Sequence, residues 1–177
     1  MSKWFYKNKK IDRELSNKLG IHPAIIKILA DRGVETEEDI REFLAADLSK
    51  VSDGSELTDM EKGVSIIQDA IAAGKHIRII GDYDVDGVTS TYILYKGLIG
   101  LHAKCDKFIP HRIKDGYGLH ENAIRRARED GVEVILTCDN GIAAADAVSL
   151  AKEFGMTVVV TDHHEVPFVQ EPDGRRY

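Results

Sequence analysis

The stretch HIRIIGDYDVDG, at residues 76–87, decides the fold of this 177-residue chain. Its first half is a short, mainly apolar segment of the kind that forms a buried strand. Its second half is a loop with a glycine at each end and three aspartates between them. Charged groups directly after a strand are typical of open α/β sheets, in which ligands bind outside the carboxyl ends of the strands.

Strand and helix patterns alternate along the chain from this stretch onward. The predicted strands are residues 76–81, 103–110, 133–138 and 156–161, and the predicted helices between them are residues 88–101, 120–130 and 143–154. Strands that alternate with helices of about a dozen residues indicate βαβ units. The predicted fold class is therefore α/β, with a parallel β-sheet flanked by helices.

The chain before this stretch has a different pattern. Residues 1–52 predict an amino-terminal helical segment with short helices, and VSDGS at 51–55 is a small, polar linker candidate. The predicted domains are therefore residues 1–52 and 53–177. Thr58, followed by Glu61 three residues later, predicts a capping box that opens a further helix, which ends at Gly74.

Composition limits the class of protein. Hydrophobic residues make up 43% of the chain, which is typical of a globular protein, and no apolar run approaches the roughly 20 residues needed to cross a bilayer. Only two cysteines are present, so we expect a reduced, cytoplasmic protein without contact to a membrane. The formal charge of -6 argues against a protein that coats nucleic acid, because such proteins usually carry a basic surplus.

The loop at 81–87 carries the strongest chemical signal. In an extended segment, the alternate spacing of Asp82, Asp84 and Asp86 would point all three carboxylates to the same side, where they repel one another unless a cation is present. The alternative is a solvated acidic turn. A calcium-binding EF-hand loop is excluded, because its twelfth position would be Ile93 and because a strand precedes the motif.

Two other predicted strands are followed by residues of types that bind metals. Asp139 begins an Asp-Asn-Gly sequence that would also be typical of a simple turn, and the last strand is followed by Asp162, His163 and His164. Carboxylates suit manganese and magnesium, and imidazole suits manganese, zinc or iron. The pattern predicts a site for one or two divalent ions, which activates a water and binds a phosphoryl group.

The second predicted strand is followed by weaker signals. His111 and Arg112 would contact a phosphate, or they form an ordinary surface pair. Tyr117, between two glycines, offers a ring on which a base would stack, or it belongs to a tight turn.

Four motifs together resemble those of the DHH phosphoesterase superfamily. They are GDYDVDG at 81–87, PHRIKDGYGL at 110–119, DNG at 139–141 and TDHHEVP at 161–167. Within the superfamily they are most similar to the single-strand-specific 5′→3′ DNA exonucleases of DNA repair and recombination. The resemblance covers about residues 4 to 168.

This resemblance implies a role for each motif residue. It implies metal ligands at Asp84, Asp86, Asp139 and His163, with Asp82 as a further candidate in the same motif. It implies that His164 contacts the phosphate or assists the leaving group and that Asp162 orients the histidines. His111, Arg112 and Tyr117 are expected to contact nucleic acid. The implied cofactors are Mn²⁺ or Mg²⁺, two ions in the complete protein, and the implied partners are single-stranded DNA, single-strand-binding protein and a helicase.

Members of this family continue beyond the point that corresponds to Tyr177, so we expect a lobe that is truncated at its carboxyl end. One alternative within the superfamily is a phosphodiesterase that acts on short oligoribonucleotides or cyclic dinucleotides. An alternative of another class is an inactive nucleic-acid-binding scaffold. The acidic charge is compatible with a nuclease, because Asp82, Asp84, Asp86, Asp139 and Asp162 belong to the predicted metal centre.

Overall fold

The computed structural model describes residues 12–113, 115 and 118–167. The chain divides into two compact units, Met1–Glu56 and Leu57–Tyr177, so the division falls slightly after the linker that the sequence predicts. Over the described residues, no helix combines the length and apolar character that crossing a membrane requires.

The first unit is helical. Its helices are α1 (Arg13–Leu19), α2 (Pro23–Asp31) and α3 (Glu37–Ala45), followed by the 3₁₀ turns Leu48–Lys50 and Gly54–Glu56. Thr36 begins α3 by accepting a hydrogen bond from the Asp39 amide. Ile26, Leu29 and Ile40 form the small apolar core of this unit.

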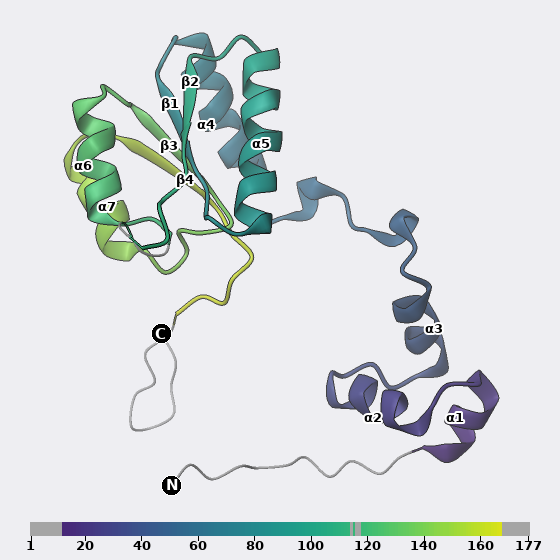
Figure 1. The fold of residues 1–177 in the computed structure, drawn as a ribbon. Helices are drawn as coiled ribbons and strands as arrows, with labels where there is room; N and C mark the ends of the chain where they lie inside the picture. Colours follow the sequence, from purple (N-terminus) through teal and green to yellow (C-terminus); the bar gives the residue numbers. More distant parts are fainter. Residues whose placement is uncertain (1–11, 114, 116–117, 168–177) are drawn as a thin grey trace, which may run out of the picture. The chain divides into compact units, whose positions relative to one another are not determined.

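The second unit is a parallel sheet between two layers of helices (Figure 1). The strands β1 (Ile77–Ile80), β2 (Cys105–Phe108), β3 (Val134–Cys138) and β4 (Thr157–Thr161) pair in the order β2-β1-β3-β4. The predicted α/β class with a parallel sheet is confirmed. Each predicted strand is present, shortened by one to four residues.

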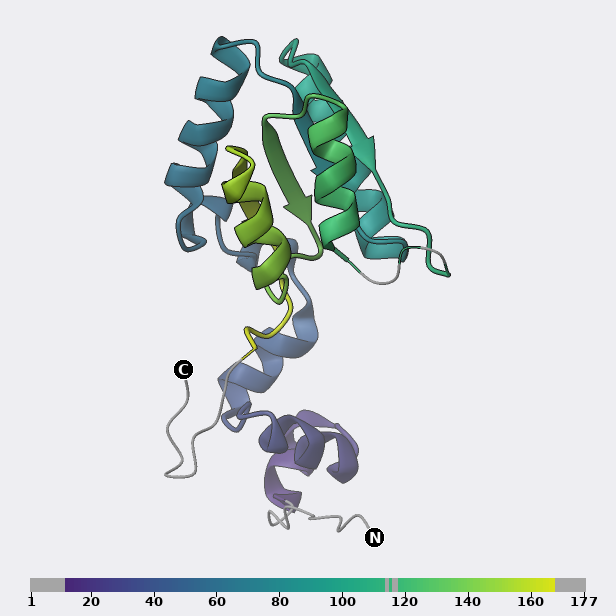
Figure 2. The same ribbon diagram turned by 90° about the vertical axis from the view of Figure 1, so that its left-hand side faces the viewer.

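The helices of this unit are α4 (Met60–Ala72), α5 (Val85–Gly100), α6 (Glu121–Glu129) and α7 (Ala145–Glu153). Figures 1 and 2 show α4 and α5 on one face of the sheet and α6 and α7 side by side on the other. The alternating side chains of the strands fill both interfaces. In β3, for example, Val134 and Leu136 pack on the α4–α5 side, and Ile135 packs on the α6–α7 side.

The beginning of α4 corrects the predicted capping box. The residue before the helix is Asp59, which has a left-handed backbone (φ 57°) and makes no side-chain capping bond. Thr58 therefore lies one residue too early to cap the helix. The sequence pattern identified the helix but not its first residue, because two adjacent residues are both of a capping type.

Candidate metal centre

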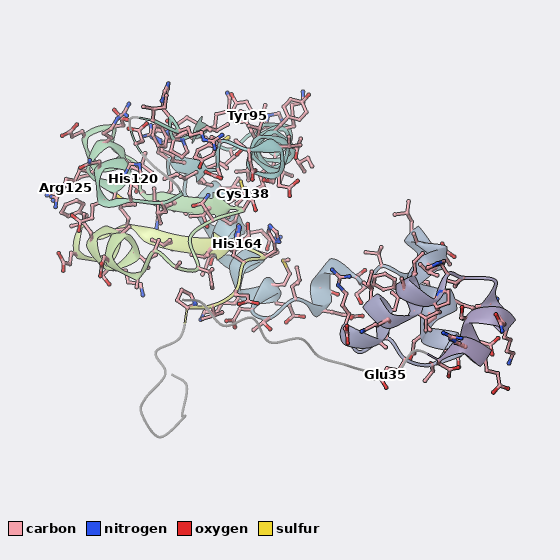
Figure 3. All side chains as sticks on the ribbon, turned by 60° about the horizontal axis from the view of Figure 1, so that its bottom comes forward. Glu35, Tyr95, His120, Arg125, Cys138 and His164 are labelled. Atoms are coloured by element: carbon pink, nitrogen blue, oxygen red, sulfur yellow. The ribbon has the colours of Figure 1, made fainter. Side chains whose placement is uncertain are left out.

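The topology of the sheet brings three loops to one edge. The chain passes from β1 outward to β2 on one side, and β3 pairs with β1 on the other side, so the strand order changes direction between β1 and β3. Such a point is where open α/β sheets bind ligands. The loops after β1, β3 and β4 supply Asp82 and Asp84, Asp139, and the Asp162–His164 segment. In Figure 3, Cys138 lies at the end of β3 and His164 lies just beyond the end of β4.

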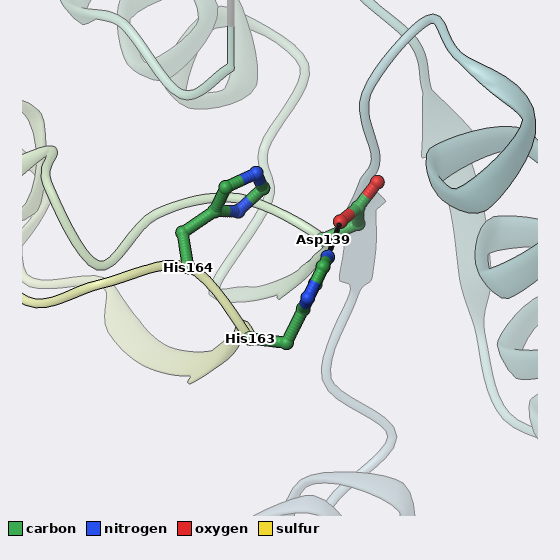
Figure 4. A group of neighbouring side chains, drawn as sticks. All are labelled: Asp139, His163 and His164. Atoms are coloured by element: carbon green, nitrogen blue, oxygen red, sulfur yellow. Dashed lines mark hydrogen bonds and ion pairs between the residues drawn. The ribbon is translucent and has the colours of Figure 1, made fainter. Parts of the chain in front are cut away.

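Asp139, His163 and His164 form a group whose potential ligand atoms all lie within 4.8 Å of one another. Figure 4 shows the His163 ring directed at Asp139, with 2.8 Å between His163 Nε2 and Asp139 Oδ1. The Asp139 side chain is only 6% exposed, and its backbone is left-handed, with a φ of 60°. A carboxylate and an imidazole in this arrangement either share a proton or hold a cation.

Asp84 lies near this group. The carboxyl groups of Asp84 and Asp139 are close enough for each to affect the pKa of the other. Burial raises the pKa of Asp139, and the negative charge of Asp84 raises it further, although His163 opposes both effects. The hydrogen bond from the Gly87 amide is the main cause that lowers the pKa of Asp84. Two neighbouring carboxylates repel one another, and a proton or a cation between them would relieve the repulsion.

Asp162 holds the histidine segment in place. Its side chain is 2% exposed, and it accepts hydrogen bonds from the Ile142 amide (2.9 Å), the His163 amide (2.8 Å) and the His164 Nδ1–H (2.6 Å). Burial pushes the pKa of Asp162 upward, but these hydrogen bonds outweigh it, and the pKa is lowered. The same contact raises the pKa of His164. Because Asp162 holds Nδ1, any proton transfer by His164 to a substrate would use Nε2.

Asp82, in the loop after β1, carries a buried carboxylate that a cation would suit. This residue has no exposed surface, and neither of its carboxylate oxygens has a hydrogen-bond partner in the part of the chain that the structure describes. A buried carboxylate without a partner is costly, and a metal ion is one of the few groups that would compensate it. Hard oxygen ligands together with imidazole are a donor set that manganese accepts. The residues present therefore fit a divalent metal.

The three aspartates of GDYDVDG do not lie in one extended segment, and this part of the sequence interpretation is wrong. Asp84 is the N-cap of α5, because its Oδ1 accepts a hydrogen bond from the Gly87 amide at 3.0 Å. Asp86 consequently lies in the first turn of the helix and is exposed. Like Asp82 and Asp84, it is not among the residues whose potential ligand atoms lie within 4.8 Å of one another. The helix begins three residues before the predicted start at Val88.

The structure describes two of the three residues that were expected to contact nucleic acid. His111 belongs to a local turn, in which its amide donates to Asp115 Oδ2 and its ring accepts from the Ile113 amide. The Arg112 guanidinium lies 5.3 Å from the centre of the Tyr83 ring, so it reaches the loop between Asp82 and Asp84. Tyr117 lies outside the described residues.

The basic residues of α6 are engaged elsewhere. Arg125 pairs with Glu121 on the same helix and is labelled in Figure 3, while Arg126 and Arg128 lie over the rings of Phe108 and Phe154.

Asn140 is a residue whose position the sequence did not predict. The sequence places it in a turn, yet the structure buries it between the ends of β1 and β3.

Comparisons with known proteins identify a family for this chain. The sequence model described as "DHH family, N-terminal domain" matches residues 76–175. The single-stranded-DNA-specific exonuclease RecJ of Bacillus subtilis is 41% identical over 163 residues, which are 92% of this chain and 21% of that protein. RecJ of Escherichia coli is 31% identical over 159 residues, which are 89% of this chain and 27% of that protein.

Solved structures give the same match. A crystal structure of exonuclease RecJ bound to manganese has a TM-score of 0.57 and 38% identity, covering 63% of this chain and 29% of that chain. RecJ of Thermus thermophilus in complex with Mn²⁺ has a TM-score of 0.56 and 30% identity, covering 88% of this chain and 21% of that chain. The chain thus spans about a fifth to a quarter of the length of its curated relatives.

Proposed function

The chain belongs to the DHH family, and from this premise we propose that its second unit is the catalytic lobe of a metal-dependent exonuclease that degrades single-stranded DNA from the 5′ end. The observation that carries the proposal is the group of Asp139, His163 and His164, whose potential ligand atoms lie within 4.8 Å of one another, with Asp84 near Asp139. Asp82, which is buried and has no hydrogen-bond partner among the described residues, follows β1 at the same edge of the sheet. Relatives that match most of this chain are named single-stranded-DNA-specific exonucleases, and two RecJ structures similar to this chain hold manganese.

The proposed metal ligands are Asp84, Asp139 and His163, with Asp82 and Asp86 as further candidates. Bound there, one or two Mn²⁺ or Mg²⁺ ions would supply an activated water and neutralise the charge of the phosphoryl group. The chain positions this chemistry by holding Asp84 at the N-cap of α5 and Asp139 at the end of β3. In the hydrolysis, water adds to phosphorus and the bond from phosphorus to the 3′-oxygen breaks.

His164 is the proposed proton donor or phosphate contact. Asp162 holds its Nδ1–H and raises its pKa, which keeps the ring charged to a higher pH than a free histidine. The charged ring would attract the phosphate and supply a proton from Nε2 to the departing 3′-oxygen. Asp162 acts through His164 and is a positioning residue.

Arg112 is proposed to contact the DNA backbone next to the metal centre. Its guanidinium is oriented by the Tyr83 ring, and a guanidinium binds phosphate oxygens through its planar set of donors. His111 and Tyr117 complete the proposed contacts to DNA. An enzyme that acts on single strands in the cytoplasm would work beside a helicase that separates strands and a protein that covers them, and these are its proposed partners.

The test uses the longest natural polypeptide that contains this chain and single-stranded DNA labelled at its 5′ end, with Mn²⁺. We expect release of labelled mononucleotides, and a loss of at least about 100-fold in kcat for Asp139→Ala, because the variant lacks a ligand that the reaction requires. Arg41→Ala in the first unit is the control. Unchanged cleavage by Asp139→Ala would remove the metal-centre assignment, and a preference for dinucleotides over long strands would favour the oligoribonucleotide phosphodiesterase instead.

A further inference from the structure

Asn140 directly follows the proposed ligand Asp139 and is 2% exposed. An asparagine is rarely buried so completely, because its amide must then find partners within the protein. The sequence Asp-Asn-Gly would also be satisfied by an exposed turn, which needs no buried amide. The position of the Asn140 side chain therefore calls for its own explanation.

The Asn140 amide joins the ends of the two central strands. Its Nδ2 donates to the carbonyl oxygen of Ile80 at 3.0 Å and to the carbonyl oxygen of Cys138 at 2.9 Å. Ile80 is the last residue of β1, and its partner in the ladder is Thr137. Asn140 thus adds a side-chain link between β1 and β3 just past the last ladder pair.

The orientation of this amide is fixed. The reverse orientation would place Oδ1 against two carbonyl oxygens, which also accept hydrogen bonds and would repel it. Oδ1 itself is buried and has no partner among the described residues, so the two donated bonds are what hold the side chain. A third segment packs on the same side chain, because a Cβ added at Gly118 would lie 3.4 Å from the Asn140 Cβ.

The two linked strands carry the opposing carboxylates. The loop that holds Asp82 and Asp84 leaves β1 immediately after Ile80, and Asp139 lies between Cys138 and Asn140. Fixing the Ile80 carbonyl relative to Asn140 therefore fixes the loop after β1 relative to the backbone of Asp139. The carboxylates of Asp84 and Asp139 follow different strands, β1 and β3. The distance between these two carboxylates therefore depends on how the ends of β1 and β3 are joined.

We propose that Asn140 is a positioning residue of the metal centre, which holds the β1 loop against Asp139 so that their carboxylates face a common ion. The inference rests on the proposed function, since it takes this cluster to be a metal site. It differs from a purely structural role, in which loss of the amide would lower the stability of the protein and leave the affinity for metal unchanged.

The experiment compares Asn140→Ala with Glu133→Ala. Glu133 is a matched control, because its Oε2 accepts a hydrogen bond from the His76 amide and so links the same two strands at their opposite ends. Mn²⁺ titration by calorimetry, at a temperature at which circular dichroism shows both variants folded, gives Kd. We expect Asn140→Ala to raise Kd by about 10- to 100-fold, as loss of a residue that orients ligands does. We expect Glu133→Ala to change Kd less than about twofold, because it is remote from the site.

A second readout needs no metal. In the metal-free protein, hydrogen exchange at the Gly87 amide reports on the loop after β1, since this amide donates to Asp84. The proposal expects faster exchange there in Asn140→Ala than in Glu133→Ala. If Asn140→Ala does not fold, Asn140→Ser, which keeps one donor, should show the same changes at smaller size.

The outcomes separate this inference from the proposed function. Wild-type protein that binds no Mn²⁺ would overturn the metal centre itself. Wild-type protein that binds Mn²⁺ while Asn140→Ala binds it equally well would overturn only the role of Asn140. Equal increases of Kd in Asn140→Ala and Glu133→Ala would also contradict the proposal, because they would show that any loosening of the strand pair is sufficient.

Discussion

Asp82 carries a carboxylate with no exposed surface and no hydrogen-bond partner among the described residues, and this makes it sensitive to the presence of metal. In the metal-free protein, Asp82→Asn should raise the free energy of unfolding at pH 7 by about 1–2 kcal/mol, because a buried carboxylate without a partner is costly. Thermal unfolding in the presence of a chelator measures this change.

The same variant should respond less to metal. In the wild type, Mn²⁺ at 100 times its Kd should add about 2.7 kcal/mol to the free energy of unfolding. Asp82→Asn should lose part of this increase. If the variant is less stable than the wild type without metal, the buried carboxylate of Asp82 is not destabilising. If the variant gains as much stability from Mn²⁺ as the wild type, Asp82 does not face the ion.

Two glycines of α5 provide a matched test at the level of the element. A Cβ at Gly87 would lie 2.4–2.6 Å from the backbone of Asp82, whereas a Cβ at Gly97 would meet nothing within 4 Å. Gly87→Ala should lower the free energy of unfolding by at least about 2 kcal/mol, because the backbone of Asp82, in the loop after β1, would have to move. Gly97→Ala should raise it by about 0.5–1 kcal/mol, because alanine favours a helix.

Urea unfolding followed by circular dichroism measures both changes. Mn²⁺ affinity should fall in Gly87→Ala and stay constant in Gly97→Ala. Equal effects of the two substitutions on stability would contradict the close contact between the first turn of α5 and the loop after β1.

The amino ends of the strands are held by an ion pair that depends on pH. Arg78 on β1 donates to Asp106 on β2 at 2.6 and 2.7 Å and to Asp130 at 2.8 Å. Burial pushes the pKa of Asp106 upward, but its bonds to Arg78 and His76 outweigh this, and the pKa is lowered. A carboxylate with a lowered folded-state pKa stabilises the fold above its unfolded-state pKa, which is about 3.9, and this contribution is lost as the pH falls through the folded-state value.

Asp106→Asn should therefore lower the free energy of unfolding by about 1–2 kcal/mol at pH 7, a loss that is limited because the carboxylate is 38% exposed. Below about pH 4 this loss should become progressively smaller. Asp130→Asn, which removes a more exposed partner of the same arginine, should cost less. Chemical unfolding across this pH range tests both. A cost of Asp106→Asn that stays constant down to pH 2 would mean that the pair does not set the acid stability.

Sequence patterns predicted the elements because their information is local. The apolar runs of β1 and β3 and the Asp162–His164 segment after β4 were all visible as strings of neighbouring residues. The start of α5 was missed because its cap, Asp84, lies inside an acidic motif that also suits an extended loop. The burial of Asn140 could not be predicted, since it depends on the Ile80 carbonyl, a partner 60 positions earlier in the chain.

At the scale of the whole molecule, the proposed ligands Asp84, Asp139 and His163 all lie in the unit Leu57–Tyr177. We therefore expect a protein of residues 57–177 to fold and to bind Mn²⁺ with a Kd within about twofold of the 177-residue chain, because a compact unit with its own core folds independently. Circular dichroism and calorimetry test this. A truncated protein that folds but binds no Mn²⁺ would show that the first unit contributes to the site.

The left-handed backbone of Asp139 also has a practical use. Asparagine, like aspartate, adopts this conformation more readily than most other residues, whereas alanine is strained there. Asp139→Asn should therefore keep the shape of the turn while it removes one anionic ligand. Such a protein would bind a strand without cutting it, and it would serve as a reagent for trapping the bound DNA end in a crystal.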